Sequence, residues 1–264
     1  MQERNRYLMR QWQNDNADHA AAPLRVRSLR VNGWNTPLGL DTSAPCFSWQ
    51  IENDIRGVEI AAFRVIIATD PDRLDPETAD VWDSGIVDAN DHSILCPCEF
   101  HSCRRYWWQV RVQDTSGREA ISAPAWFDTG LRAEDWHAEW IWRTSDRVVN
   151  DFAYFRKSFA LTKPVACAKM FVSAHHVVQP FINGERMGGF GTPAPTNPWK
   201  RKFYTSYDIT AYLREGDNWI AAVAHYLGGD GQNYVNGLPG FRMQLQIRYA
   251  DGRTESIGTD ETWM

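Results

Sequence analysis

Strict alternation of apolar and polar side chains is the feature that most constrains this sequence. Neighbouring side chains of a strand point to opposite faces, so a period of two predicts an antiparallel strand with one face in a core. The alternation recurs in three segments, whose predicted inward sets are Phe63/Val65/Ile67, Tyr106/Trp108/Val110/Val112 and Phe241/Met243/Leu245/Ile247. Both halves of the chain are therefore expected to be β-structure.

Length and turn spacing predict two domains. The 264 residues suit two cores, since domains commonly hold roughly 100–150 residues. We expect a polar N-terminal arm at 1–22, a sandwich at 23–130, a Trp-rich linker at 131–142 and a second sandwich at 143–264. The first half has about seven short strands, the pattern of an immunoglobulin or fibronectin type III sandwich. The second half predicts a lectin-like jelly roll, so the predicted fold class is all-β with two β-sandwich domains.

Turn residues punctuate the second half. The dipeptides Asn183-Gly184 and Asp251-Gly252 each separate two apolar segments. Such dipeptides favour the two-residue type I′ turn, in which both residues have positive φ. We therefore predict a type I′ hairpin at each position.

Charge and hydropathy exclude several classes of partner. The net charge is −5 and no basic block is present, so nucleic acid is not expected to bind. No stretch approaches the ~18 apolar residues of a membrane span. The N-terminal segment also lacks the apolar core of a signal peptide. These features predict a cytoplasmic protein.

The five cysteines give no metal or disulfide pattern. Cys46 and Cys167 stand alone in apolar segments and are expected to be buried thiols. Cys96, Cys98 and Cys103 cluster, but they lack the paired Cys-x₂-Cys spacing of structural zinc sites. An odd number of cysteines also argues against a secreted disulfide framework. No metal is expected.

Two loops carry the candidate binding residues. The sequence has 13 Trp, which serve either sandwich cores and interfaces or stacking on sugar rings. Loop 192–204 is rich in proline and loop 226–240 in glycine. Aromatic rings cover sugar faces, and carboxylates and amides bind hydroxyls. The candidate carbohydrate-binding residues are Trp199, Tyr204, Asp230, Asn233, Tyr234 and Asn236; alternatively, they cap strand ends or face a neighbouring domain.

A series of motifs gives the chain a resemblance. The first half contains TPLGLDTSAPCFSWQI, VWDSGIV, YWWQVRVQDTSG and WFDTGLRAEDWHAEWI, and the second contains FRKSF, INGERMG, FYTSYDITAYLREGDN and DGRTESIGTDETW. In this order and spacing they resemble the N-terminal region of bacterial α-L-rhamnosidases. The resemblance implies a fibronectin type III-like domain and then a jelly roll in which a rhamnose-containing glycan docks. Certain relatives bind rhamnose together with calcium, which makes Asp230 a candidate ligand. One acidic residue makes no calcium site, so no cofactor is expected.

The resemblance also bears on activity. Rhamnosidase chemistry is similar to inverting glycoside hydrolysis, in which two carboxyl groups flank the bond. In the family those groups lie in a helical toroid that follows the TD-x-SW segment, and this sequence ends at Met264. The pairs Glu134-Asp135 and Asp260-Glu261 fall in turns. We expect a second domain truncated at its C-terminus, no catalytic residue here and no hydrolysis by the chain alone.

Three functions remain open at this point. The first is the accessory region of an α-L-rhamnosidase, serving as scaffold and as carbohydrate-binding module, with the missing catalytic domain as its partner. The second is a free-standing carbohydrate-binding or adaptor protein. The third is the accessory region of another glycosidase, such as a β-galactosidase. The Gly39-Leu40-Asp41 and Trp82–Gly85 motifs argue against the third.

Overall fold

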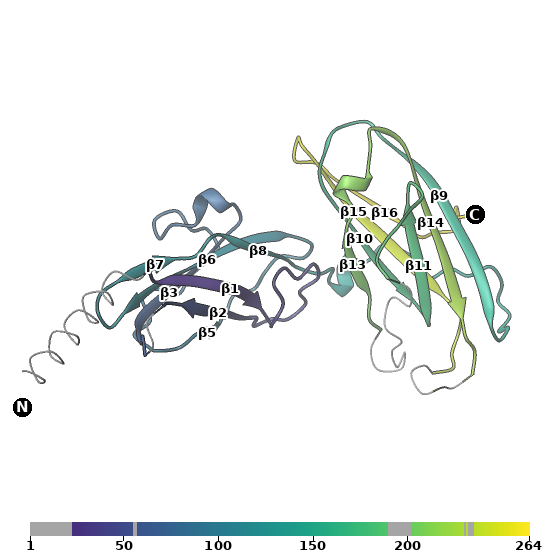
Figure 1. Cartoon of the computed structure of the whole chain (residues 1–264). Coiled ribbons are helices and arrows are strands. Elements are labelled where there is room, and N and C mark those ends of the chain that lie inside the picture. Colours follow the sequence, from purple (N-terminus) through teal and green to yellow (C-terminus); the bar gives the residue numbers. More distant parts are fainter. Residues whose placement is uncertain (1–22, 55–56, 190–201, 230, 232–234) are drawn as a thin grey trace, which may run out of the picture. The chain divides into compact units, whose positions relative to one another are not determined.

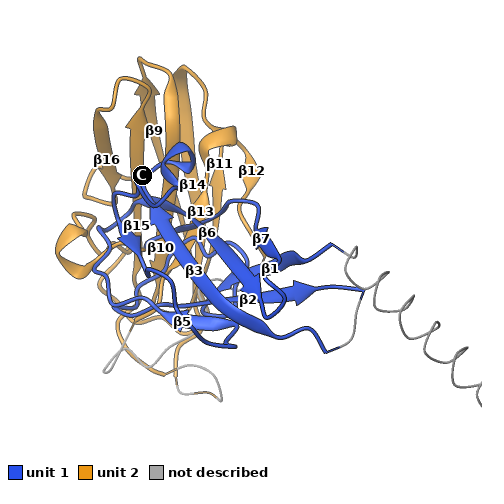
Figure 2. Cartoon of the chain, turned by 90° about the vertical axis from the view of Figure 1, so that its left-hand side faces the viewer, with its two compact units in different colours: residues 1–129 blue, residues 130–264 orange. Residues whose placement is uncertain are grey.

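The computed structural model describes residues 23–54, 57–189, 202–229, 231 and 235–264. The chain divides into two compact units, residues 1–129 and 130–264 (Figure 2). Within the described ranges no α-helix occurs, and three 3₁₀ turns interrupt the strands: η1 (Pro71–Arg73), η2 (Ala133–Asp135) and η3 (Thr210–Tyr212). None of the described helices is long and apolar enough to cross a membrane. The predicted all-β class with two sandwiches is confirmed.

Two antiparallel sheets form the first unit (Figure 1). One sheet has the order β1-β2-β5, formed by β1 (Arg25–Val31), β2 (Cys46–Glu52) and β5 (Ser93–Leu95). The other has the order β4-β3-β6-β7, with β8 also paired to β6. Its strands are β3 (Ile60–Ala68), β4 (Trp82–Asp83), β6 (Arg105–Asp114), β7 (Glu119–Ile121) and β8 (Ala125–Asp128).

The first core lies between these sheets and is aromatic. Phe47 of β2 meets Trp108 of β6 edge to face, with ring centroids 4.8 Å apart. The predicted inward sets of β3 and β6 are confirmed, since all seven side chains are buried in this core. Strand β3 is also buried on its other face, where Ile66 packs with Leu74 of the segment after it.

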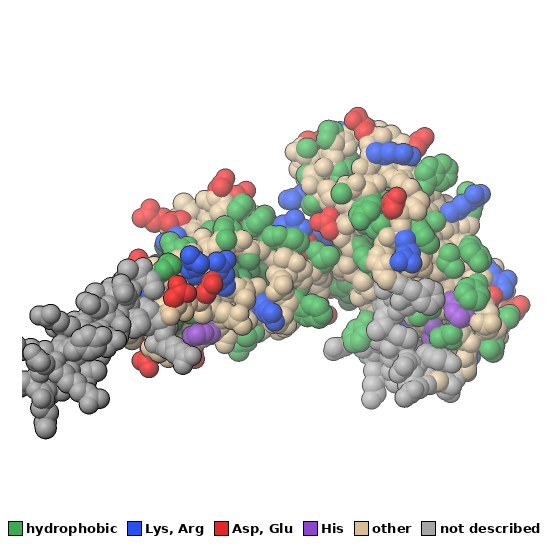
Figure 3. Space-filling view, viewed as in Figure 1, with side chains coloured by type: hydrophobic (Ala, Val, Ile, Leu, Met, Phe, Trp, Pro, Cys, Tyr) green, Lys and Arg blue, Asp and Glu red, His purple; other side chains and the backbone are tan. Residues whose placement is uncertain are grey.

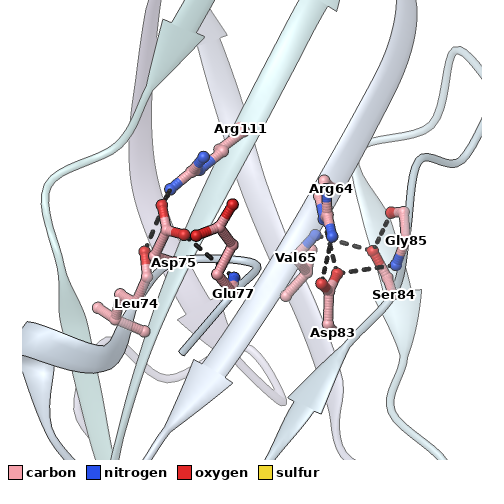
Figure 4. Close-up of polar contacts among 9 residues, drawn as sticks. All are labelled: Arg64, Val65, Leu74, Asp75, Glu77, Asp83, Ser84, Gly85 and Arg111. Atoms are coloured by element: carbon pink, nitrogen blue, oxygen red, sulfur yellow. Dashed lines mark hydrogen bonds and ion pairs between the residues drawn. The ribbon is translucent and has the colours of Figure 1, made fainter. Parts of the chain in front are cut away.

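A polar network orders the Trp82–Gly85 motif on the outer face of the first unit (Figure 4). The Arg64 guanidinium pairs with both carboxylate oxygens of Asp83, and its Nε lies 2.7 Å from Oδ1. The same carboxylate accepts the Gly85 N–H at 2.9 Å. Ser84 Oγ accepts the Val65 N–H at 2.9 Å. The hydrogen bond from Arg64 holds the pKa of Asp83 below its usual range. Because Asp83 and Ser84 both bond to residues of β3, the motif fixes this segment on the strand.

Arg111 fixes the neighbouring loop in a similar way (Figure 4). It is the cross-strand partner of Arg64, and it donates to the Leu74 carbonyl at 3.2 Å and to Asp75 at 3.1 Å. Asp75 also accepts the Glu77 N–H at 3.1 Å. The positive charges of the two adjacent guanidinium groups are thus neutralised by carboxylates from two different segments.

Two four-stranded sheets form the second unit (Figure 1). The first has the order β13-β10-β15-β16, formed by β10 (Val165–Ala174), β13 (Thr205–Asp208), β15 (Phe241–Tyr249) and β16 (Thr254–Gly258). The second has the order β12-β11-β14-β9, formed by β9 (Asp151–Leu161), β11 (Val177–Ile182), β12 (Glu185–Arg186) and β14 (Gly216–Tyr226). Their inner faces share one core, in which Phe241, Met243, Leu245 and Ile247 are buried as predicted.

The expected linker, residues 131–142, packs on the second unit. Trp136 lies edge to face with Phe171 of β10, with centroids 6.4 Å apart. The buried Gln244 of β15 accepts the N–H groups of His137 and Ala138 at 2.7 and 3.0 Å. The ring of Trp136 thus covers the outer face of β10, whereas Trp142 packs against the core beside Phe155 and Trp140 is largely exposed.

The two Gly-containing hairpins differ. Asn183 and Gly184 both have positive φ, 50° and 89°, which confirms the type I′ prediction between β11 and β12. The prediction for Asp251-Gly252 is wrong, because only Gly252 has positive φ, at 85°. Tyr249 bonds to Arg253 across a three-residue loop. Asp-Gly suits that loop as well, with the glycine in the left-handed position.

The cysteine prediction also needs correction. Cys46 and Cys167 are half-buried, whereas Cys96 is fully buried. Cys46 opens β2 on the face opposite to the buried Phe47, so the alternation of the strand turns its thiol outward. Burial raises the pKa of Cys96 to about 12. Within the described ranges, no three His, Cys, Asp or Glu side chains group closely enough to hold a metal ion.

Candidate functional site

The described ends of both candidate loops contact one turn at one end of the second sandwich. The turn His175-His176 joins β10 to β11. The His175 N–H donates to the Gly240 carbonyl at 2.8 Å, at the end of loop 226–240. The Lys202 ammonium, near the end of loop 192–204, donates to the His175 carbonyl. The described ends of the two loops therefore lie on the same turn.

The two histidines share one acceptor. Their Nε2 atoms lie 2.9 Å (His175) and 3.1 Å (His176) from the Val235 carbonyl oxygen. A carbonyl only accepts, so both Nε2 atoms carry a proton. The Leu227 N–H donates to His176 Nδ1 at 2.9 Å, which leaves Nδ1 without a proton. His176 is consequently neutral and held in a single tautomer.

Tyr226 completes this group of rings. It stacks on His176 with centroids 4.9 Å and planes 6° apart. Its hydroxyl lies 2.9 Å from Asn236 Oδ1 and 2.7 Å from the Gly237 carbonyl oxygen. A Cβ at Gly237 would lie 2.3 Å from His175 Cε1. Glycine is therefore required where this loop crosses the imidazole.

Burial sets the charge at this end. Burial, together with the nearby His175 and Lys202, lowers the pKa of His176 to about 4. Burial lowers the pKa of His175 as well. Burial alone lowers the pKa of Lys202 to about 8. At neutral pH both imidazoles are neutral, in agreement with their hydrogen bonds.

The predicted site residues separate into three groups. Tyr204 accepts the Leu131 N–H at 3.0 Å through its hydroxyl, and its ring lies edge to face with Trp136, 5.5 Å away. Asn236 is exposed beside Tyr226, at the end just described. The remaining four lie outside the described residues: Trp199, Asp230, Asn233 and Tyr234.

Sequence reasoning missed His175, His176 and Lys202. The available signal is the polar doublet His175-His176 between apolar strands, which carries polar groups into a turn beside a core. The two histidines share the partner Val235, which lies 60 and 59 residues further along the chain. A pattern confined to the doublet does not identify that partner.

A second exposed feature lies on the outer face of β9 and β14. Phe152, Tyr154 and Trp219 are exposed to 43%, 73% and 48%. Phe152 stacks on His225 with centroids 3.9 Å apart. Figure 3 shows hydrophobic and histidine side chains reaching the surface of this unit. Phe152 lies near the His175-His176 turn, since its partner His225 also pairs with Val177, whereas Trp219 lies near the opposite end of β14.

The chemistry available at the turn is that of recognition. Its described residues contribute imidazole, amide, ammonium and backbone groups, and the segments 173–177, 202–204, 226–229 and 235–240 contain no Asp or Glu. Glycoside hydrolysis by paired carboxyl groups needs two such residues. The described groups can instead form hydrogen bonds with the hydroxyls of a neutral ligand.

Comparison with known proteins places both units. Residues 26–133 match the family model of the Rha78A-like N-terminal immunoglobulin domain. Residues 163–264 match that of the alpha-L-rhamnosidase N-terminal domain. An alpha-L-rhamnosidase of Formosa agariphila is 29% identical over 88% of this chain and 28% of its own length.

Solved structures agree with these matches. The alpha-L-rhamnosidase from Dictyoglumus thermophilum has a TM-score of 0.81 and 28% identity, covering 90% of this chain and 29% of that one. The enzyme from Aspergillus terreus, at 21% identity and a TM-score of 0.77 over 91% of this chain and 29% of its own, shares the fold. The chain thus spans less than a third of these relatives. It corresponds to the N-terminal region of the α-L-rhamnosidases, an immunoglobulin-like domain followed by the rhamnosidase N-terminal domain.

Proposed function

We propose that this chain is the accessory region of a glycoside hydrolase that acts on terminal α-L-rhamnose. In this proposal the first unit is a scaffold and the second binds carbohydrate at the His175 turn. The family matches over residues 26–133 and 163–264 support the rhamnosidase part. The catalytic domain of such an enzyme is the expected partner, and the cytoplasm is the expected location.

The convergence of two loops on one polar turn carries the binding part of the proposal. Asn236 is exposed, and its amide has donors and acceptors that match vicinal hydroxyls. The residues that hold it are neutral rings and backbone groups, so the site presents no carboxylate of its own within the described segments. A neutral monosaccharide suits such a surface better than a cation does.

Calorimetric titration of L-rhamnose into the chain tests the proposal, with D-galactose as the comparison sugar. Binding is expected to be weak, because a millimolar dissociation constant corresponds to only about −4 kcal/mol. Asn236→Ala, Trp199→Ala and Tyr234→Ala should each weaken it. Ser158→Ala, exposed on β9, is the matched control and should leave it unchanged.

The outcomes separate the functions. Saturable binding that the three variants weaken supports the carbohydrate site. Absence of saturable binding up to the solubility of the sugar would leave only the scaffold function. Binding that none of the three weakens would place the sugar elsewhere, with the exposed Phe152 and Tyr154 rings as the next candidates.

A further inference from the structure

We propose that His175 and His176 are positioning residues, which hold the backbone of residues 235–237 in the arrangement that a carbohydrate bound at this end requires. This inference rests on the proposed function and adds the residues that organise its site. Both imidazoles are buried, so their role is exerted through the loop rather than by direct contact with sugar.

The loop depends on these rings for its order. Glycine-rich segments lose much conformational entropy when they are fixed, and residues 228–240 contain five glycines. His176 contacts the loop at both ends, since it accepts from the Leu227 N–H and donates to the Val235 carbonyl. One ring thus joins the exit of β14 to the segment that precedes β15.

His175 adds a second set of contacts. It donates to the same Val235 carbonyl through Nε2 and to the Gly240 carbonyl through its backbone N–H. Its ring packs closely against Gly237, where a methyl group would clash. The segment 235–240 is therefore fixed by hydrogen bonds at both ends and by close packing between them.

The surroundings keep His176 neutral. The titratable groups that face it are His175, Lys202 and His225, and Tyr226 stacks on its ring. Protonation of Nδ1 would place a second donor against the Leu227 N–H and break that hydrogen bond. The described neighbours thus maintain the tautomer that both loop contacts need.

Amide hydrogen exchange together with the imidazole ¹⁵N spectrum tests the proposal on the full chain. In the unmodified protein at neutral pH, His176 should carry its proton on Nε2 alone. His176→Phe keeps a ring beside Tyr226 but removes both loop contacts, and it should speed exchange at Leu227 and Gly237 roughly tenfold or more. His176→Gln keeps a donor and an acceptor and should fall between. His92→Phe is the control, since His92 is exposed in the first unit, and it should change exchange at these two amides less than about twofold.

The outcomes also separate this inference from the proposed function. Faster exchange with weaker L-rhamnose binding in His176→Phe supports it. Exchange that stays within about twofold of the unmodified protein, or unchanged binding despite faster exchange, would overturn it. A proton on His176 Nδ1 would overturn it even if the Phe variant failed to fold. Absence of L-rhamnose binding by the unmodified protein would instead mark failure of the proposed function.

Discussion

The side-chain oxygen of Gln244 accepts the backbone N–H of Ala138 at 3.0 Å, across 106 residues of sequence. The same amide accepts the His137 N–H at 2.7 Å and donates to the Asp135 carbonyl at 2.8 Å. One buried side chain therefore satisfies three backbone groups of the segment 131–142. This clamp explains why that segment belongs to the second unit.

Gln244→Ala should destabilise the second unit by about 2 kcal/mol, because it removes the acceptor of two N–H groups, one of them on the buried Ala138. Urea unfolding measures the change. Gln246→Ala is the control, because Gln246 lies on the same strand as Gln244 and makes one exposed hydrogen bond, to Ser256 of β16. This variant should lower the free energy of unfolding by less than about 0.5 kcal/mol. Equal costs for the two variants would contradict the clamp.

Acidification should weaken the second unit through His176. Its pKa is 6.5 in the reference state and about 4 in the fold, so the unfolded chain takes up the proton first. This stability is fully present above pH 6.5 and is lost as pH falls towards 4. One pKa unit is worth about 1.4 kcal/mol, which gives a loss of up to ~3 kcal/mol.

Chemical unfolding of the unmodified chain and of His176→Phe between pH 7 and 4.5 checks this expectation. The variant should lose less stability over that window than the unmodified chain. The pKa values of Asp83 and Asp151 are lowered from a reference of 3.8. The stability that these carboxylates contribute is therefore lost only below the pH window tested. Parallel pH profiles for the two proteins would contradict the role of His176.

Asp83→Asn should destabilise the first unit, since it removes the charge that pairs with Arg64. Both side chains are partly exposed, at 27% and 23%, and solvent screening limits the expected cost to about 1 kcal/mol. Thermal melting measures it. Asp88→Asn, exposed a few residues further on, should leave the melting temperature unchanged. A melting temperature for Asp83→Asn equal to that of the unmodified chain would show that the pair adds nothing.

Cys96 should resist alkylation in the folded protein. Its thiol is buried with a pKa of about 12, and only the thiolate reacts. Iodoacetamide at pH 8 followed by peptide mass spectrometry should label the half-buried Cys98 first and Cys96 only after unfolding. Labelling of Cys96 at the same rate as Cys98 would contradict its place in the core.

The sequence predicted those parts of the fold that follow a local period. The inward set of β6, from Tyr106 to Val112, could be assigned because alternate side chains of one strand share a face. The three-residue loop at Asp251-Gly252 could not, since the same dipeptide serves two hairpin types. Asn236 was identified from its loop, but its place beside Tyr226 became evident only in the fold.

Tyr204 illustrates the other limit. Its chemistry suits sugar stacking, yet its ring contacts Trp136 and its hydroxyl bonds to Leu131. The His175-His176 turn was missed for a related reason, because its hydrogen bonds join segments about 60 residues apart, with separations of 60 and 59. The type of a side chain identifies it as a candidate for ligand binding. Only the tertiary contacts show which of these candidates already bond to other residues of the fold.

The most direct test of the account follows backbone amide chemical shifts while L-rhamnose is titrated into the ¹⁵N-labelled chain. Carbohydrate binding at the proposed end predicts saturable shifts centred on Asn236, Gly237 and the His175-His176 turn, with the amides of β3 and β6 unmoved. Shifts centred instead on Phe152 and Tyr154, or no saturable shift in the second unit, would contradict the proposed site.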